Sequence, residues 1–486
     1  MPNKEETFFS KEFYFLIAMI AVTAVTVVPF AFTGFATGDD VQYYITANTQ
    51  DIWAQSYNYA QGNGRFYFVF MMPIFYQWLP YIFDNFVATK MVNVSFIVLN
   101  YLLFALIIKE IFKNKWLAFL CYLIGMVFIS IKGINNPIAS YPIYFSLSFS
   151  LILYSLYCAI KFNDTQLRKY KTLSVIFFAL GLLFYENYLI YLPLILGFII
   201  YHQFKDSKKS LVLKLKRAFI IVLPYSIVVF VYLAAYIGWR LVFNQYQYSG
   251  AMIATHNSIW DFLNTITSIS RGAYPLFFYF SEHSVFTENS FILENHEHGL
   301  PNVFLHAKIE WVFKAVIVSL LFFYIIQRVN LIEKRKVFYA GLIGVIFIYS
   351  PQFLLATTEK YMTLVKCCGI TNYLTTYFSV FPVALLLGII LLIPVFLIPK
   401  EKFLISYKVF ISVLIGLACV VNDYSNDHAL TDLKNPLYTF QAFEELTQTK
   451  AFKAIPANSF IYAPQLYKEN SEISTMFGQV FDWSDY

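Results

Sequence analysis

Charged residues are scarce in this chain. Only 13% of its 486 residues are Asp, Glu, Lys or Arg, whereas soluble domains carry about 25%. The chain is 59% hydrophobic and holds 53 Phe and 38 Tyr, more than a soluble core of this length can bury. The composition therefore excludes an ordinary soluble protein and predicts an all-helical (all-α) integral membrane protein.

Cysteine pairs and glycine motifs are also missing. The chain has five cysteines and no Cys-x-x-Cys pair, so its sequence supports neither a zinc site nor a disulfide framework. It has no phosphate-binding glycine loop, which excludes the common nucleotide-binding sites. We therefore expect no metal and no cofactor. We also expect no nucleic-acid partner, because the basic residues that give the net charge of +6 lie in short loops between hydrophobic runs.

Hydrophobic runs predict about eleven membrane-spanning helices. They cover residues 13–32, 88–109, 116–132, 141–160, 172–184, 186–204, 217–239, 309–326, 337–354, 374–398 and 404–421. The aromatic run 66–83 contains Pro73 and Pro80 and is ambiguous. If it crossed the membrane, the basic loop at 109–115 would face outside, so we predict that it lies in the interface as part of a helix pair.

The distribution of basic residues orients the protein. The short loops that hold most of the lysines and arginines face the cytoplasm, which places the N-terminus inside and the C-terminus outside. The longer segments 34–87, 240–308 and 355–373 then lie on the outer face. A membrane domain over 1–421 is followed by an outer tail or small domain over 422–486. We expect the function on the outer face, because every inner loop is short.

Two adjacent acids open the first outer segment. Asp39 and Asp40 stand within the stretch Gly38–Tyr44, just after the first span. One carboxylate of such a pair can act as a general base on a hydroxyl group. The alternative is that one of them caps a helix that begins near Val41. Tyr43, three residues on from Asp40, is a candidate for acceptor binding or support.

Four outer cations are candidate ligands for a phosphate group. For each of them the alternative is a membrane anchor or simple flanking charge. Arg65 has a third possible role, an ion pair that holds the aspartate loop. The four are Arg65, Arg271, Lys360 and Lys366.

Glu186 is an acid between two apolar runs near an outer helix end, a position that marks a functional candidate. It could bind a substrate that accepts a transferred group or pair with an outer arginine, and Tyr185 beside it could support either role. The alternative is that Tyr185-Glu186-Asn187 is only the polar turn of a helical hairpin.

The order of these features resembles the GT-C superfamily of polytopic glycosyltransferases. One span is followed by an outer loop that opens with Gly38-Asp39-Asp40 and closes with Gly62-Asn63-Gly64-Arg65. The chain is most similar to the Gtr-type, serotype-converting glucosyltransferases that modify O-antigen in Gram-negative bacteria. The Tyr185-Glu186-Asn187 element also resembles a feature of such proteins.

The resemblance implies an inverting transferase at the periplasmic face of the bacterial inner membrane. It would move a hexose, such as glucose, from undecaprenyl phosphate to O-antigen or a related lipid-linked polysaccharide. It implies Asp39 as the base with Asp40 in support. The partners implied are the lipid-linked donor and acceptor, a small flippase and a donor synthase.

Two other functions are compatible with a polytopic chain. An O-antigen polymerase would rely on arginines in its outer loops, but these loops hold only Arg65, Arg240 and Arg271. A secondary transporter would show polar residues in mid-span and an internal repeat. The predicted spans have little charge away from their ends, and no repeat is visible, so we place both below the transferase.

Overall fold

The computed structural model describes residues 4–454 apart from 35–36, 38, 41–42, 44–50, 84–85, 132–135, 206–209, 244–249, 251, 255–257, 277–282, 285–286, 289–298, 330–332, 371–372, 399 and 448. Within that part of the chain the architecture is helical, as predicted. The exception there is an antiparallel pair of two-residue strands, β1 (His283–Ser284) and β2 (Thr287–Glu288).

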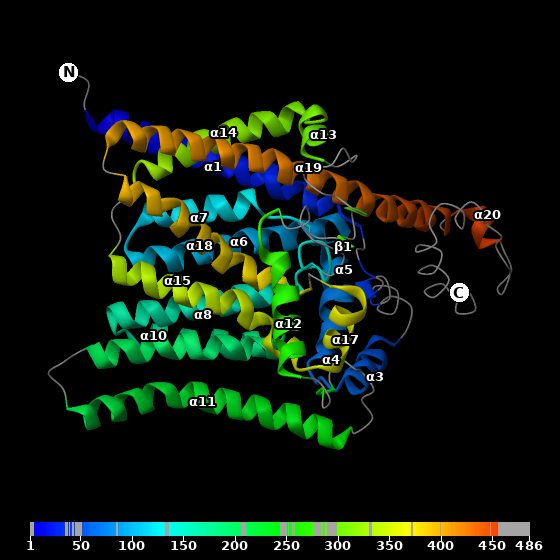
Figure 1. The fold of residues 1–486 in the computed structure, drawn as a ribbon. Coiled ribbons are helices and arrows are strands. Elements are labelled where there is room, and N and C mark those ends of the chain that lie inside the picture. The colour runs from blue at the N-terminus through cyan, green and yellow to red at the C-terminus, as the bar shows by residue number, and fades with distance from the viewer. Residues whose placement is uncertain are drawn as a thin grey trace.

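Eight helical segments of the described chain are long and apolar enough to cross a membrane, so the protein is a multi-pass membrane protein. Figure 1 shows the helices of these segments alongside one another. They are α1 (Lys4–Val27), α6 (Phe86–Phe112), α8 (Tyr144–Thr165), α11 (Leu211–Val242), α14 (Ile309–Ile326), α15 (Lys334–Tyr349), α18 (Thr376–Leu397) and α19 (Glu401–Thr447). The first continues into the turn η1 (Val28–Phe32), and α15 continues through η7 (Ser350–Gln352) into α16 (Phe353–Ala356).

The other three predicted spans are helices too, but shorter ones. They are α7 (Lys115–Val127), α9 (Arg168–Leu182), and α10 (Leu192–Lys205), which the turn η3 (Glu186–Tyr191) precedes. None reaches the roughly 17 residues that a span needs, so helix length supports eight of the eleven predicted spans. The predicted end of the span 116–132 is wrong, because α7 ends at Val127. The carbonyls of Val127 and Ile129 accept hydrogen bonds from Asn422 instead of from a further helical turn.

The first outer segment folds into short helices at one end of the bundle. Asp51 caps α3 (Ile52–Asn63) by accepting from the backbone N–H groups of Trp53 and Ala54, and Gly64 ends it with a φ of 63°. The ambiguous run 66–83 then forms α4 (Phe68–Met72), the π-helical segment η2 (Pro73–Trp78) and α5 (Leu79–Phe83). In Figure 1 this run lies across the long helices, at the end away from the start of α1.

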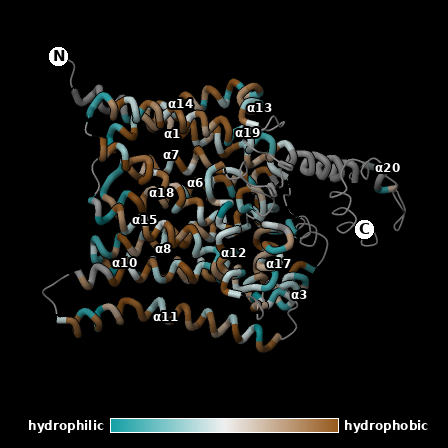
Figure 2. Tube along the Cα trace, viewed as in Figure 1, coloured by the Kyte–Doolittle hydropathy of each residue, from teal (hydrophilic) through white to brown (hydrophobic). Residues whose placement is uncertain are grey.

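Other short elements gather at this same end (Figure 1), which we call the outer end. They include α12 (Ile259–Ser270), the turn η5 (Arg271–Ala273), α13 (Leu300–Leu305) and α17 (Glu359–Cys368). In Figure 2 hydrophobic residues fill the long helices, whereas hydrophilic residues gather toward their ends. In the described chain the more polar elements thus lie at the ends of the long helices, where a membrane would meet water.

Helix α19 is longer than predicted. The last span was expected to end at 421, but the helix runs on for 47 residues in all, to Thr447, and α20 (Lys450–Lys453) follows. Asn422 and Asn426, beyond the expected end, are buried against the segment after α7. The predicted boundary at 421 therefore falls inside a helix. Residues 455–486 of the predicted tail lie outside the described residues.

Three cysteines are buried and free: Cys121, Cys158 and Cys419. Cys367, near the end of α17, is disulfide-bonded. The sequence supported no disulfide, so this expectation was wrong at Cys367.

Candidate functional site

The aspartate pair lies on a helical turn at the outer end. Asp39 and Asp40 have helical backbone, and Thr37 caps their turn by accepting the Asp40 N–H at 3.1 Å. Thr37 therefore caps this turn, the role that was the alternative for one of the aspartates. Both carboxylates are left for other contacts. Asp39 is exposed to solvent, whereas Asp40 is completely buried.

Asp40 is held by two donors. Its Oδ1 accepts the Tyr76 hydroxyl at 2.7 Å and the Tyr141 backbone N–H at 2.9 Å, whereas its Oδ2 is buried without a hydrogen-bond partner among the described residues. Burial raises the pKa of Asp40 above its ordinary 3.8, and the charge of Lys90 and the two hydrogen bonds oppose that rise. Loss of either donor would leave a further buried oxygen of this carboxyl group with weaker hydrogen bonding.

Tyr141 joins the two acids. Its backbone holds Asp40, and its hydroxyl donates to Oδ2 of Asp39 at 2.7 Å. Burial raises the pKa of the Tyr141 hydroxyl well above 10.0, so the group stays protonated and remains a donor. One residue from the segment before α8 thereby sets the position of both carboxylates.

Lys90 supplies the positive charge near the pair. It lies in the first turns of α6, is 1% exposed, and its Nζ donates to the carbonyl of Ala139. The sequence reasoning missed Lys90, although a signal existed: a lysine inside the predicted span 88–109 is costly unless it has a partner. Tyr76 and Tyr141 were missed as well, because nothing in their spacing links them to position 40.

Tyr43 supports the pair through packing. It is 2% exposed, its hydroxyl is hydrogen-bonded to that of Tyr59, and its ring meets those of Tyr59 and Tyr76 edge to face, each at 5.2 Å. Tyr76 in turn donates to Asp40. Tyr43 is thus a buried residue that supports the pair through its contact with Tyr76. Its buried position does not favour contact with an acceptor.

Arg65 and Glu186 form a second polar cluster. Their side chains make an ion pair at 2.7 Å and are 12% and 17% exposed. The Tyr67 hydroxyl also donates to Glu186, and the Arg65 guanidinium lies 5.7 Å from the ring centre of Phe68. Of the roles considered for Glu186, the structure shows the pairing with an outer arginine. That pair ties the chain just after α3, in the middle of the segment 34–87, to the start of η3.

Tyr185 packs beside this cluster. It is 6% exposed, and its ring meets Phe145 at 5.3 Å and Tyr188 at 5.7 Å. These are ring contacts of a core residue. The three residues of the Tyr185-Glu186-Asn187 element are therefore inward-facing, since Asn187 is also buried and donates to the carbonyl of Pro351.

The remaining predicted cations differ in how they are engaged. Lys366 pairs with Asp261 at 3.1 Å, and Lys360 is half-buried, 5.7 Å from the ring centre of Tyr361. Arg271, in η5, is exposed, and no acid of the described chain pairs with it. Among the predicted phosphate ligands, Arg271 therefore has the most available charge.

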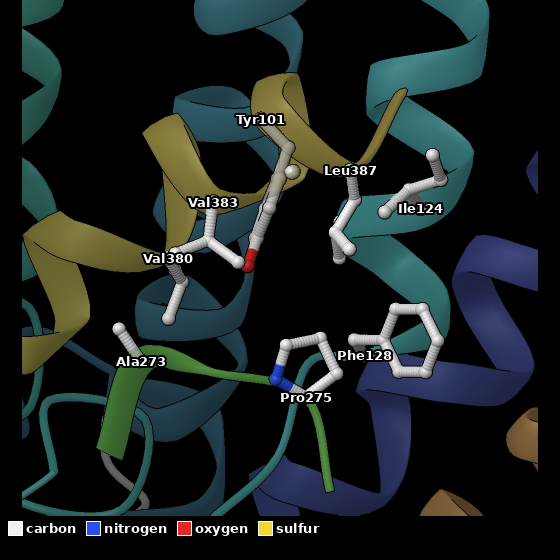
Figure 3. A pocket seen from close by; sticks show the side chains of 10 residues that line it. Tyr101, Ile124, Phe128, Ala273, Pro275, Val380, Val383 and Leu387 are labelled. Atoms are coloured by element: carbon white, nitrogen blue, oxygen red, sulfur yellow. The ribbon is translucent and has the colours of Figure 1, made fainter. Parts of the chain in front are cut away.

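Figure 3 shows a small apolar pocket of about 230 Å³, part of it open to solvent, between α6, α7, α18 and the segment after η5. Ala273, Pro275 and Val380 line it, with Tyr101 at one side. It contains no acid and no base other than the Tyr101 hydroxyl. The lining of this pocket therefore offers no carboxylate for acid–base chemistry.

The chemistry available at the outer end is that of carboxylates, tyrosines and cations. In the described part of the chain no group of three His, Cys, Asp or Glu residues could hold a metal ion. An exposed carboxylate such as that of Asp39 can accept a proton from a hydroxyl group that is placed beside it.

Comparison of the chain with known proteins finds no matching family model, no similar curated protein and no similar solved structure. The resemblance to the GT-C glycosyltransferases therefore stays a prediction from the residues that carry it.

Proposed function

We propose that the protein is an inverting glycosyltransferase that moves a hexose from a polyprenyl phosphate to a lipid-linked polysaccharide. The observation that carries the proposal is the aspartate pair at the outer end: Asp39 is exposed, Asp40 is buried, and Tyr141 holds both. The proposal keeps Asp39 as the base and Asp40 as its support.

The reaction needs only one carboxylate. Asp39 takes the proton from an acceptor hydroxyl as its oxygen attacks the anomeric carbon of the donor. The bond from that carbon to the phosphate oxygen breaks, and the electron pair leaves with the polyprenyl phosphate. This leaving group is already an anion and needs no proton, so one carboxylate suffices, unlike glycoside hydrolysis, which uses two.

The leaving phosphate does need positive charge near it. Arg271 is the preferred ligand, because it is exposed, whereas Arg65 and Lys366 pair with Glu186 and Asp261. Lys360 is a further candidate. Arginine is well suited to this role, since its guanidinium can donate two parallel hydrogen bonds to a phosphate.

The proposed setting is the periplasmic face of a bacterial inner membrane. We retain eleven spans with the N-terminus in the cytoplasm, and α4–η2–α5 in the interface. The position of the short outer helices in Figure 1, away from the start of α1, supports this orientation. Modification of O-antigen with glucose, with a flippase and a donor synthase as partners, follows only from the family resemblance.

The test is sugar transfer in detergent from labelled polyprenyl-phosphate glucose to a lipid-linked polysaccharide. Wild type is compared with Asp39→Asn and Asp40→Asn, each checked for a monodisperse elution profile. We expect transfer by wild type and loss of about 10²–10⁴-fold in kcat for Asp39→Asn. Full activity in both variants would refute the mechanism, and an inert wild type with all polyprenyl-linked hexoses would refute the function.

A further inference from the structure

The two hydrogen bonds from Tyr141 to the aspartates come from a segment with unusual backbone geometry. Residues 136–143, which we call the clamp segment, precede α8. Tyr141 has a φ of 50° and Ile143 a φ of 71° with a ψ of −37°. A positive φ is rare outside glycine and is a genuine outlier for a β-branched residue such as Ile143. Strain of this kind persists only where surrounding contacts enforce it.

One face of α6 supplies such contacts. Asn93 donates from Nδ2 to the carbonyls of Pro137 and Ile138, at 3.2 and 3.3 Å, and accepts the N–H of Ile143 on Oδ1 at 2.9 Å. One turn earlier, Lys90 donates to the carbonyl of Ala139. Asn93 therefore binds the clamp segment on both sides of Tyr141.

These contacts are sealed from water. Asn93 and Ala139 are completely buried, and Lys90 and Ile143 are 1% and 2% exposed. Loss of one partner here leaves buried polar groups unsatisfied, and water cannot easily replace it. The amide of Asn93 has the donors and the acceptor that the segment requires, in one rigid group on one helix.

We propose that Asn93 is a positioning residue for the aspartate pair, because it holds the clamp segment in the strained backbone from which Tyr141 binds Asp39 and Asp40. This inference deepens the proposed function and rests on it for its catalytic consequence. Its structural content, that Asn93 keeps Asp40 buried and fixed, is independent of the reaction.

Asn100 is the matched control. It lies on the same helix two turns further on and is also completely buried. It donates to the carbonyl of Ser146 and to the Tyr377 hydroxyl, both at 2.9 Å, and accepts the Ser150 hydroxyl. Truncation at Asn100 removes a comparable set of buried hydrogen bonds without touching the clamp segment.

The first readout is transfer kinetics of Asn93→Ala, Asn100→Ala and wild type, normalised to folded protein. We expect kcat of Asn93→Ala to fall about 100-fold, the scale of a 1 Å misplacement, with KM for the donor unchanged. Asn100→Ala should unfold at a lower temperature but keep kcat. Replacing Ile143 by Gly in the Asn93→Ala background should recover part of kcat, since glycine adopts the positive φ without strain.

The second readout needs no activity. Carboxyls are labelled with a water-soluble carbodiimide and an amine, and the modified residues are identified by mass spectrometry. Wild type and Asn100→Ala should be labelled at Asp39 and protected at Asp40, whereas Asn93→Ala should be labelled at both. Continued protection of Asp40 in Asn93→Ala would overturn the proposal, even if transfer were never observed. An inert wild type combined with the expected labelling would refute the function and leave the positioning role standing.

Discussion

Two carboxylate clusters lie at the outer end of this protein, and they are built differently. At the aspartate pair, the cation Lys90 is buried and one acid, Asp39, faces solvent. At the second cluster, Glu186 is in direct contact with Arg65, and both are largely buried. Each cluster has a tyrosine hydroxyl that donates to an acid.

The difference lies in what remains free to react. Arg65 forms an ion pair with Glu186 directly, so that cluster fixes two chain segments to each other. Asp39 makes no ion pair within the described chain; it faces solvent and accepts the Tyr141 hydroxyl. Acid–base work is thus expected at the first cluster and structural work at the second.

Truncation of Arg65 should have the largest effect on stability. Arg65→Ala leaves Glu186 buried and unpaired, which is expected to cost about 3 kcal/mol of folding free energy. Thermal unfolding in detergent measures this loss, and the double variant Arg65→Met with Glu186→Met should regain much of it. A stable Arg65→Ala that binds donor weakly would instead make Arg65 a phosphate ligand.

Removal of the Tyr141 hydroxyl should have a smaller effect, confined to catalysis. Tyr141→Phe keeps the backbone N–H on Asp40 and deletes only the hydrogen bond to Asp39. Hydrogen bonds to charged groups contribute about 1.5–3 kcal/mol, so we expect kcat to fall by about one order of magnitude with the unfolding temperature nearly unchanged. Tyr67→Phe, the matched change at the second cluster, should leave kcat as it is.

The pH profile sharpens the contrast further. Burial raises the pKa of Asp40, so as pH falls Asp40 becomes protonated at a higher pH than an ordinary aspartate. Once neutral, Asp40 accepts the hydrogen bonds of Tyr76 and Tyr141 more weakly, so the turn that carries Asp39 is held less firmly and kcat should decline. The charge of Lys90 lowers this pKa, so Lys90→Met should move the contribution of Asp40 to the acidic limb to higher pH, while Asp40→Asn should remove that contribution. An acidic limb that Lys90→Met does not move would contradict this account.

The smallest effect is expected at Lys366. Its ion pair with Asp261 is exposed to solvent, where such pairs contribute little to stability. Lys366→Ala should change neither the unfolding temperature nor KM for the donor. A clear rise in KM would restore Lys366 as a phosphate ligand.

The sequence predicts the membrane architecture well because lipid imposes a simple rule on it. Eight of the predicted spans coincide with long apolar helices. The course of α19 past 421 could not be predicted in the same way, because hydropathy marks where lipid ends and not where a helix ends. Asn422 and Asn426 are polar yet buried, and their partners lie almost 300 residues earlier in the chain.

The site could be predicted in part. Asp39 and Asp40 stand out because two adjacent acids follow a span, and Glu186 stands out because it is an acid near membrane depth. The contacts of Tyr141 with the pair span about 100 residues, and no local pattern encodes them. The choice of Arg65 as partner for Glu186 is also a tertiary contact, so the sequence could offer it only as one of several roles.

The most direct test of the difference between the clusters is transfer by Asp39→Asn and Glu186→Gln side by side. Both changes remove one negative charge with little change in shape, and both proteins are normalised to folded material. The account predicts that Asp39→Asn loses transfer while Glu186→Gln, though less stable, retains it per folded molecule. Retained transfer in Asp39→Asn together with its loss in Glu186→Gln would contradict the account and move the base to the second cluster.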